Sequence, residues 1–314
     1  MKMLNYIIRR SLLIIPNVIL LTALLFWSVT ALLGSPAAMM LGEDASPQAL
    51  AELNSVYGFD RSVFEQYLSW VWSALQGDFG RSFATQERVI EAILPRIPAS
   101  IELAGLAILL AMFGATVLNS IPHAKGVLTT FNTVLSVIGI TVPNFMLGIS
   151  LIYVFSVTLG WLPTSGWVYW SVDPIKHIMH LILPVVTLSA FYFGSFTLVY
   201  RAEYKVIYRQ LFVKVARAKG LSESRISFKH ILPNSILPVI TYIGLSLGQL
   251  TGGAVVTETV FSVPGIGRLF VQSISSHDFP VMLAIGMIII VGVVFMNLLA
   301  DILYTVVNPQ IRLE

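Results

Sequence analysis

The sequence predicts an all-α membrane protein with six transmembrane helices, and three observations support that prediction. Hydrophobic residues make up 56% of the 314 residues and charged residues only 11%, whereas a soluble domain carries about 25% charged residues. The mean hydropathy is +0.82. A spanning helix needs about 20 mostly apolar residues, and six stretches qualify: residues 11–33, 101–122, 130–159, 180–199, 236–256 and 281–306.

The first apolar stretch has two interpretations. Lys2, Arg9 and Arg10 precede residues 11–33 in the way that basic residues precede the apolar region of a secretory signal. That region of a signal has about 7–15 residues, whereas this stretch has about 23. We therefore expect a retained first helix.

The third stretch, residues 130–159, is longer than a span requires and contains Pro143 and Gly148. Proline interrupts the backbone hydrogen bonds of a helix, and an overlong helix can tilt. We expect this helix to be kinked, tilted or partly outside the membrane.

The lysines and arginines predict that both termini are cytoplasmic. Cytoplasmic loops are enriched in basic residues, and an inner N-terminus places 13 of the 19 basic residues inside. Eight of them lie in the loop 200–235, against Glu203 and Glu223. The inner set is Lys2, Arg9, Arg10, Lys125, Arg201, Lys205, Arg209, Lys214, Arg217, Lys219, Arg225, Lys229 and Arg312. The outer set is Arg61, Arg81, Arg88, Arg96, Lys176 and Arg268.

Two polar segments interrupt the single transmembrane domain that we expect over residues 1–314. The first, residues 34–100, is too long for a simple connection and is predicted to be extracytoplasmic. Its eight acidic residues predict attraction to a positively charged surface. The stretch 64–75 has helix-spaced apolar positions with aromatic residues. It fits a helix on the membrane interface or against a partner, and equally a helix packed on top of the bundle.

The second polar segment, residues 200–235, is predicted to form two short helices joined by a tight turn. Gly220 follows Arg217 and Lys219, as expected where a helix with cations in its last turn ends in a left-handed glycine. Ser222 is a good N-cap for the next helix. A merely solvated basic loop needs no such caps. A DNA-binding helix-turn-helix has a similar pattern, but the flanking apolar stretches argue against nucleic acid.

This inner loop resembles the cytoplasmic coupling loop of permease subunits in ABC importers. The family pattern is Glu-Ala-Ala, three residues, Gly, nine residues, then Ile-x-Leu-Pro. The matching positions are Ala216, Gly220, Leu232 and Pro233, and the departures are Lys214, Val215 and His230. The run Ala-Arg-Ala-Lys-Gly-Leu at 216–221 is similar to the dipeptide, oligopeptide and nickel branch of that family.

Other landmarks of that branch recur in order along about 300 residues. They are Arg9-Arg10 with Pro16, Gly58-Phe59-Asp60, Gln66-Tyr67, Gly77-Asp78-Phe79-Gly80 with Ser82, Pro98 with Glu102-Leu103, Pro143 with Phe145, Trp161-Leu162-Pro163, Leu183-Pro184, Glu258 with Phe261, Pro264-Gly265 with Gly267, Asp278-Phe279-Pro280, Asn297-Leu298 with Asp301, and Asn308-Pro309 with Ile311-Arg312. One departure is Ser35, where the branch usually has aspartate.

The resemblance implies a permease subunit of an ATP-driven importer for small peptides in the bacterial cytoplasmic membrane. It implies a heterodimer with a second, related permease subunit, two cytoplasmic ABC ATPase subunits and an extracytoplasmic substrate-binding protein. The ATPases are expected to contact the inner loop at Lys214, Ala216, Arg217, Ala218, Lys219, Gly220, Leu221, Ser222, Arg225, Leu232 and Pro233. The outer gate, or the contact with the binding protein, is expected at Asp78, Glu258, Pro264, Gly265 and Asp278. ATP-driven movement would rock the bundle between outward- and inward-facing states.

The sequence lacks a nucleotide-binding loop, because no Gly-x4-Gly-Lys-Ser/Thr motif occurs. We therefore expect no catalytic residue and no cofactor in this chain, with ATP and Mg bound by the partner subunits. The absence of cysteine excludes disulfides and thiolate metal sites. Glu102 and Asp301 are ionisable residues at the ends of apolar stretches, and for both we favour a structural role.

Histidines raise the alternative of a nickel or metal-chelate cargo. His177 and His180 are three residues apart and are expected on one face at the outer mouth of the fourth helix, with His277 also at the outer surface. Imidazole pairs at that spacing can bind nickel or copper. We favour polar anchoring at the interface, and hence no metal site in this subunit. A passive channel or a membrane enzyme is the remaining alternative, but an enzyme would need polar catalytic groups at mid-depth.

Overall fold

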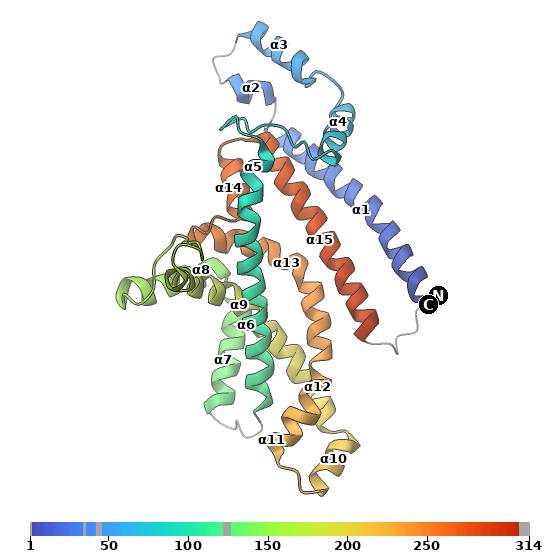
Figure 1. The fold of residues 1–314 in the computed structure, drawn as a ribbon, viewed down its shortest axis with the longest axis vertical. Coiled ribbons are helices and arrows are strands. Elements are labelled where there is room, and N and C mark those ends of the chain that lie inside the picture. Colours follow the sequence, from blue (N-terminus) through green and yellow to red (C-terminus); the bar gives the residue numbers. More distant parts are fainter. Residues whose placement is uncertain (1, 34–35, 42–45, 122–126, 308–314) are drawn as a thin grey trace. The chain divides into compact units, whose positions relative to one another are not determined.

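The computed structural model describes residues 2–33, 36–41, 46–121 and 127–307 (Figure 1). Over these residues the chain is helical, with no β-strand and one isolated bridge between Arg81 and Arg88. The elements are α1 (Lys2–Leu33), α2 (Pro36–Leu41), α3 (Pro47–Tyr57), α4 (Val63–Leu75), α5 (Val89–Ile93), the 3-10 turn η1 (Leu94–Arg96), α6 (Ile97–Ser120), α7 (Val127–Thr141), α8 (Asn144–Leu151), the π-helical η2 (Ile152–Thr158), α9 (Pro174–Tyr208), α10 (Leu211–Ala218), α11 (Glu223–Ile226), the π-helical η3 (Ser227–Ile231), α12 (Leu232–Ser235), α13 (Leu237–Phe261), α14 (Ile266–Ser275) and α15 (Phe279–Val307).

Between four and six segments of the described chain are long and apolar enough to cross a membrane. Four single helical segments qualify: Leu13–Ala31, Val89–Ser120, Pro174–Tyr208 and Phe279–Leu299. The number rises to six if two pairs of consecutive helices each form one span: Thr129–Thr141 with Asn144–Thr158, and Gly252–Phe261 with Ile266–Ser275. The predicted all-helical fold with several candidate membrane spans is confirmed, and the six-helix topology stays a prediction.

The third apolar stretch is broken where the sequence predicted a kink. Helix α7 ends at Thr141 and α8 begins at Asn144, with an angle of 119° between the two halves. Pro143 is the N-cap of α8 in an extended conformation. Proline disfavours helical backbone in the residue before it, so the chain leaves the helix at Val142 and starts a new one.

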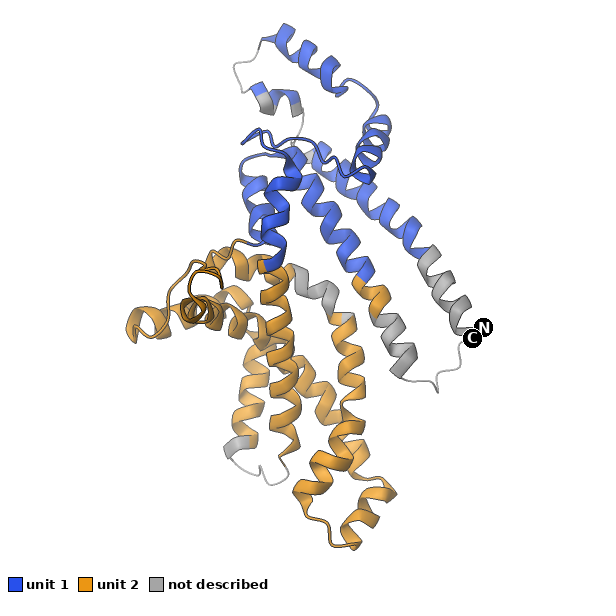
Figure 2. Cartoon of the chain, viewed as in Figure 1, with its two compact units in different colours: residues 1–98, 265–295, 313 blue, residues 99–264, 296–312, 314 orange. Residues whose placement is uncertain are grey.

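The described chain divides into two compact units (Figure 2). Unit 1 comprises residues 1–98 and 265–295, and unit 2 comprises residues 99–264 and 296–312. Whether the whole chain acts as the single domain expected from the sequence stays a prediction.

Helix α9 is the centre of unit 2. Its buried side chains Leu188, Tyr192 and Phe196 belong to a core that includes Leu103 and Ala107 of α6. Helix α7 approaches α9 so closely that only small residues fit. A Cβ added at Gly139 would lie 2.1 Å from the Ala190 carbonyl oxygen, and one at Gly194 would lie 2.5 Å from the Ser136 carbonyl oxygen. Small residues let helix backbones approach in this way within membranes.

Unit 1 has its core between α1, α4 and α15. The rings of Phe26 and Tyr67 meet edge to face at 5.9 Å, and Phe279 meets Phe26 in the same way at 6.0 Å. The Tyr67 hydroxyl lies 2.9 Å from Thr22 Oγ1 and donates to the Ile19 carbonyl at 3.0 Å. A long-range polar contact therefore fixes α4 against α1.

Helix α4 has one packed face and one exposed aromatic face. A capping box between Ser62 and Glu65 starts the helix. Tyr67 on one face is buried against α1, while Phe64 and Trp72 are 68% and 67% exposed. One face of the helix is thus packed, and the other presents aromatic side chains to the surroundings.

Candidate functional site

The inner module, which we define as residues 211–235, carries most of the site residues predicted from the sequence. It consists of α10, α11, η3 and α12, at the end of unit 2 where α9 leads in and α13 leads out (Figure 1). Its first helix ends in a Schellman motif. Gly220 has a φ of +77° and its N–H donates to the Arg217 carbonyl at 3.0 Å. The Leu221 N–H donates to the Ala216 carbonyl at 3.3 Å.

The second helix of the module begins immediately after this turn. Ser222 is extended, and its hydroxyl accepts from the Arg225 N–H at 3.4 Å. Glu223 lies in the first turn of α11, where a carboxylate interacts favourably with the helix dipole. The two caps predicted from the sequence are therefore present, and they join the helices through a turn of four residues, 219–222.

A small apolar core holds the module together. Val213, Ala216, Ile226 and Ile231 are buried in it, and Leu221 packs against them. Ala216 therefore faces the interior of the module, where its small side chain packs among these apolar residues. Ala218 is exposed and lies on the surface that a partner can reach.

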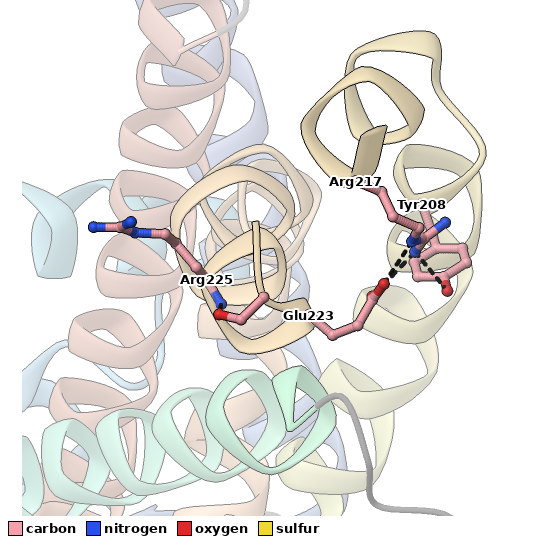
Figure 3. A network of polar contacts seen from close by, with 5 residues as sticks. Tyr208, Arg217, Glu223 and Arg225 are labelled. Carbon is pink, nitrogen blue, oxygen red and sulfur yellow. Dashed lines mark hydrogen bonds and ion pairs between the residues drawn. The ribbon is translucent and has the colours of Figure 1, made fainter. Parts of the chain in front are cut away.

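An ion pair ties the two helices together on the outside (Figure 3). The Arg217 guanidinium donates to the Glu223 carboxylate through Nε at 2.5 Å and through Nη2 at 3.0 Å. Nη2 also donates to the Tyr208 hydroxyl at 2.9 Å. These hydrogen bonds to Glu223 raise the pKa of Arg217 above its ordinary value. Arg225 points away from this cluster (Figure 3).

A chain of hydroxyl groups, most of them buried, connects the module to α6 and α9. Ser227 of η3 donates to the carbonyl of Ser120 at the end of α6. The Tyr204 hydroxyl of α9 lies 3.0 Å from Ser227 Oγ, and the Tyr200 hydroxyl is hydrogen-bonded to Ser120 Oγ. These residues could not be predicted from the sequence, because serine and tyrosine in helices give no sign of their long-range partners.

The exposed surface of the module is mixed apolar and cationic. The exposed predicted residues are Lys214, Arg217, Ala218, Lys219, Gly220, Ser222, Arg225 and Pro233, whereas Leu221 and Leu232 are half-buried. Three further apolar side chains on α10 are exposed: Leu211, Phe212 and Val215. Apolar contacts rimmed by charge are typical of protein interfaces, so the geometry suits the docking of another protein.

Two of the predicted outer carboxylates are buried within their own units. Asp278 of unit 1 accepts from the Ser82 hydroxyl and, at 3.0 Å, from the Phe83 N–H. Glu258 of unit 2 is 1% exposed and accepts from the Ser100 hydroxyl at 2.6 Å. Both carboxylates therefore hold neighbouring segments of their own unit in place.

The other three outer residues differ in exposure. Asp78 is exposed, and its carboxylate accepts from the Gly80 N–H at 3.0 Å within a turn. Pro264 is half-buried, and Gly265 is the buried N-cap of α14 in an extended conformation. Of the predicted outer set, Asp78 has the side chain most accessible to a partner.

The expectation that His177 lies at the outer surface is wrong. Its side chain is 2% exposed, with Nδ1 2.6 Å from the Val168 carbonyl oxygen and Nε2 2.8 Å from Glu102 Oε1. Trp167 packs edge to face against it at 5.0 Å. Both ring nitrogens are occupied, so His177 does not form a ligand pair with His180. Among the described residues no group of three or more histidine or acidic side chains is placed to hold a metal ion.

A nucleophile motif in the sequence, Gly-x-Ser-x-Gly at 244–248, falls on a continuous helix. Such a motif acts in hydrolases when the serine lies on a sharp turn between a strand and a helix. Here Ser246 is inside α13 and donates to the Tyr242 carbonyl at 2.7 Å. The backbone does not present this serine as a nucleophile.

Comparison with known proteins covers nearly the whole chain. The family profile described as "Binding-protein-dependent transport system inner membrane component" matches residues 107–313, and the corresponding N-terminal profile matches residues 3–104. The oligopeptide transport system permease protein AppB of Bacillus subtilis (strain 168) is 38% identical over 98% of this chain and 99% of its own length. The glutathione transport system permease protein GsiC of Escherichia coli (strain K12) is 35% identical over 99% of both chains.

Proposed function

Because this chain belongs to the family of binding-protein-dependent transport system inner membrane components, we propose that it is one of two related permease subunits of an ATP-driven peptide importer. The observation that carries this proposal is the similarity to peptide permeases along 98–99% of the chain. Two cytoplasmic ATPase subunits would bind ATP and Mg, and an extracytoplasmic binding protein would deliver the cargo.

The inner module is the proposed docking site for the ATPases. Its exposed face combines Leu211, Phe212 and Val215 with Lys214 and Lys219, which complements a protein surface that is apolar at its centre and acidic at its rim. The Schellman turn and the Arg217–Glu223 pair hold that face in one shape. A preorganised surface loses less conformational entropy on binding than a flexible loop.

The hydroxyl chain is the proposed route by which the module moves the bundle. Ser227 connects the module to α6 through Ser120 and to α9 through Tyr204. Closure of the ATPases would push the module. The hydrogen bonds of Ser227, together with the apolar core of the module, would pass this displacement to α6 and α9. Alternating access then follows as a rigid-body movement of packed helices, and the different ATPase contacts in the two states supply the bias.

The proposed topology has six spans with both termini in the cytoplasm of a bacterial cell and residues 34–100 outside. The six spans are the four single helices together with the two helix pairs, each counted once. The basic residues of loop 200–235 support this orientation. The translocation path would run between this subunit and the second permease subunit.

Small peptides are the proposed cargo, since relatives named for oligopeptide and glutathione transport match along the full chain. The alternative of nickel or a metal chelate has less support, because His177 is buried with both nitrogens engaged. A cell that lacks this chain should lose uptake of a labelled tripeptide and regain it on complementation. Normal tripeptide uptake without the chain, together with lost nickel uptake, would move the cargo to metal.

A further inference from the structure

A cavity of about 470 Å³ lies entirely within unit 1. We call it the outer pocket. Its walls come from Phe26 of α1, the turn 57–61, α4, the segment 78–88 and the start of α15. Most of the lining belongs to residues 34–100, the segment proposed to be extracytoplasmic.

Three arginines dominate the charge of the outer pocket. Arg61, Arg81 and Arg88 line it together with one carboxylate, that of Asp78. Asp78 already accepts from the Gly80 N–H, and none of the three arginines forms an ion pair with a described residue. The pocket thus holds an excess of positive charge.

Two of these arginines are paired with each other across the chain. Arg81 and Arg88 lie directly opposite each other across an antiparallel bridge, and like charges in that arrangement destabilise the pairing. A carboxylate bound between the two guanidinium groups would be attracted to both of them. Guanidinium groups bind carboxylates through paired hydrogen bonds.

Aromatic side chains form the remaining walls. Tyr57 and Phe59 are stacked with ring centroids 5.7 Å apart, and Trp70, Phe79 and Phe83 also line the pocket. Arginine next to tryptophan and tyrosine is the combination most enriched among residues that dominate protein–protein binding energies.

We propose that the outer pocket receives an acidic loop of the extracytoplasmic binding protein, with its carboxylates on Arg61, Arg81 and Arg88. This inference rests on the proposed function. The three arginines are exposed, with Arg81 and Arg88 on the bridged segment and Arg61 on the turn before α4. Exposed ion pairs are individually weak. A protein loop adds contacts with the aromatic walls and engages all three cations at once, whereas a free peptide offers few carboxylates.

The sign of this contact differs from the one predicted from the sequence. Residues 34–100 carry eight acidic residues and four arginines, which predicts a positively charged partner surface. The fold gathers three of the four arginines around one cavity. The proposed contact therefore places negative charge of the partner at this point.

The test uses the complete importer in nanodiscs of neutral lipid with its binding protein. The dissociation constant is measured by biolayer interferometry at about 50 and about 300 mM salt, which differ in screening. Arg81→Gln and Arg88→Gln should each weaken binding by about tenfold at low salt and much less at high salt. The matched control is Arg96→Gln, which removes a cation of the same segment that does not line the pocket and should stay within about twofold of wild type.

Three results would overturn the inference. They are wild-type affinity in both pocket variants, direct arginine-dependent binding of a labelled tripeptide without the binding protein, and an arginine effect that appears only when the nanodiscs are remade with anionic lipid. Basal ATP hydrolysis checks assembly, and Arg81→Lys and Arg88→Lys keep the charge if a glutamine variant fails to assemble. These lysine variants keep the charge but lose the paired hydrogen bonds, so they should bind more tightly than the glutamine variants and more weakly than wild type. If even the wild-type complex binds no binding protein, the proposed function fails instead.

Discussion

Replacing Gly220 tests whether the shape of the inner module decides docking. Gly220 has a φ of +77°, and a Cβ added there would meet no atom within 4 Å. The cost of a side chain is therefore conformational, about 1–2 kcal/mol for an ordinary residue in the left-handed region. Alanine carries that cost, and valine carries more because it is β-branched. Asparagine adopts this region more readily than alanine or valine.

Strain at Gly220 would act on the two hydrogen bonds of the Schellman motif. The Gly220 N–H bond to Arg217 and the Leu221 N–H bond to Ala216 close the turn that positions Ser222 and α11. If the turn opens to relieve strain, the docked conformation becomes less populated. A penalty of one or two kcal/mol corresponds to about 5–30-fold in the apparent affinity for the ATPases.

The assay measures binding of the purified ATPase subunits to the two permease subunits in nanodiscs, together with tripeptide uptake. We expect Gly220→Ala to weaken binding by about 5–30-fold, Gly220→Val to weaken it further, and Gly220→Asn to remain nearest to wild type. Normal binding and uptake in Gly220→Val at wild-type protein levels would refute the docking role of this turn. If Gly220→Asn were as defective as Gly220→Val, any side chain at this position would block docking, and backbone strain would not be the cause.

Three further perturbations test other parts of the account. Ser227→Ala should leave ATPase binding intact but reduce the peptide imported per ATP, because it removes a hydrogen-bonded link worth about 1–3 kcal/mol; Ser224→Ala is the exposed control, and an unchanged ratio would dismiss the link. Gly194→Leu should abolish assembly of the subunit, since even its Cβ would lie 2.5 Å from the Ser136 carbonyl oxygen, and wild-type expression and thermal stability would contradict this. A cysteine at the exposed position Ser55 should react with an impermeant thiol reagent in intact cells, whereas one at Ser224 should react only after permeabilisation; the reverse pattern would invert the topology.

The turn of the inner module could be predicted from the sequence because its signals are local. A helix C-terminus with glycine, followed by serine as an N-cap, involves contacts between residues only a few positions apart. The structure has both caps at the predicted residues, Gly220 and Ser222. The break at Pro143 is local for the same reason, since proline restricts the residue that precedes it.

Side-chain burial depends on distant segments and could not be predicted in the same way. His177 is buried because Trp167 packs on it and Glu102, 75 positions away, bonds to its ring. Asp278 is buried because the segment with Ser82, 196 positions away, folds onto it. The burial of Ala216, by contrast, could have been predicted from the sequence, because it lies three residues after the apolar Val213 on the same helix face.

The central claim is that this chain conducts peptide only when ATPases drive it through the inner module. Its most direct test is reconstitution in proteoliposomes, with uptake of a labelled tripeptide and ATP hydrolysis measured on the same vesicles. We predict that the two permease subunits without the ATPases show neither activity, and that uptake requires ATP, both ATPases and the binding protein. Peptide movement down its gradient without ATPases would show a passive channel, and hydrolysis by the permease subunits themselves would show an enzyme. Either result would contradict the account.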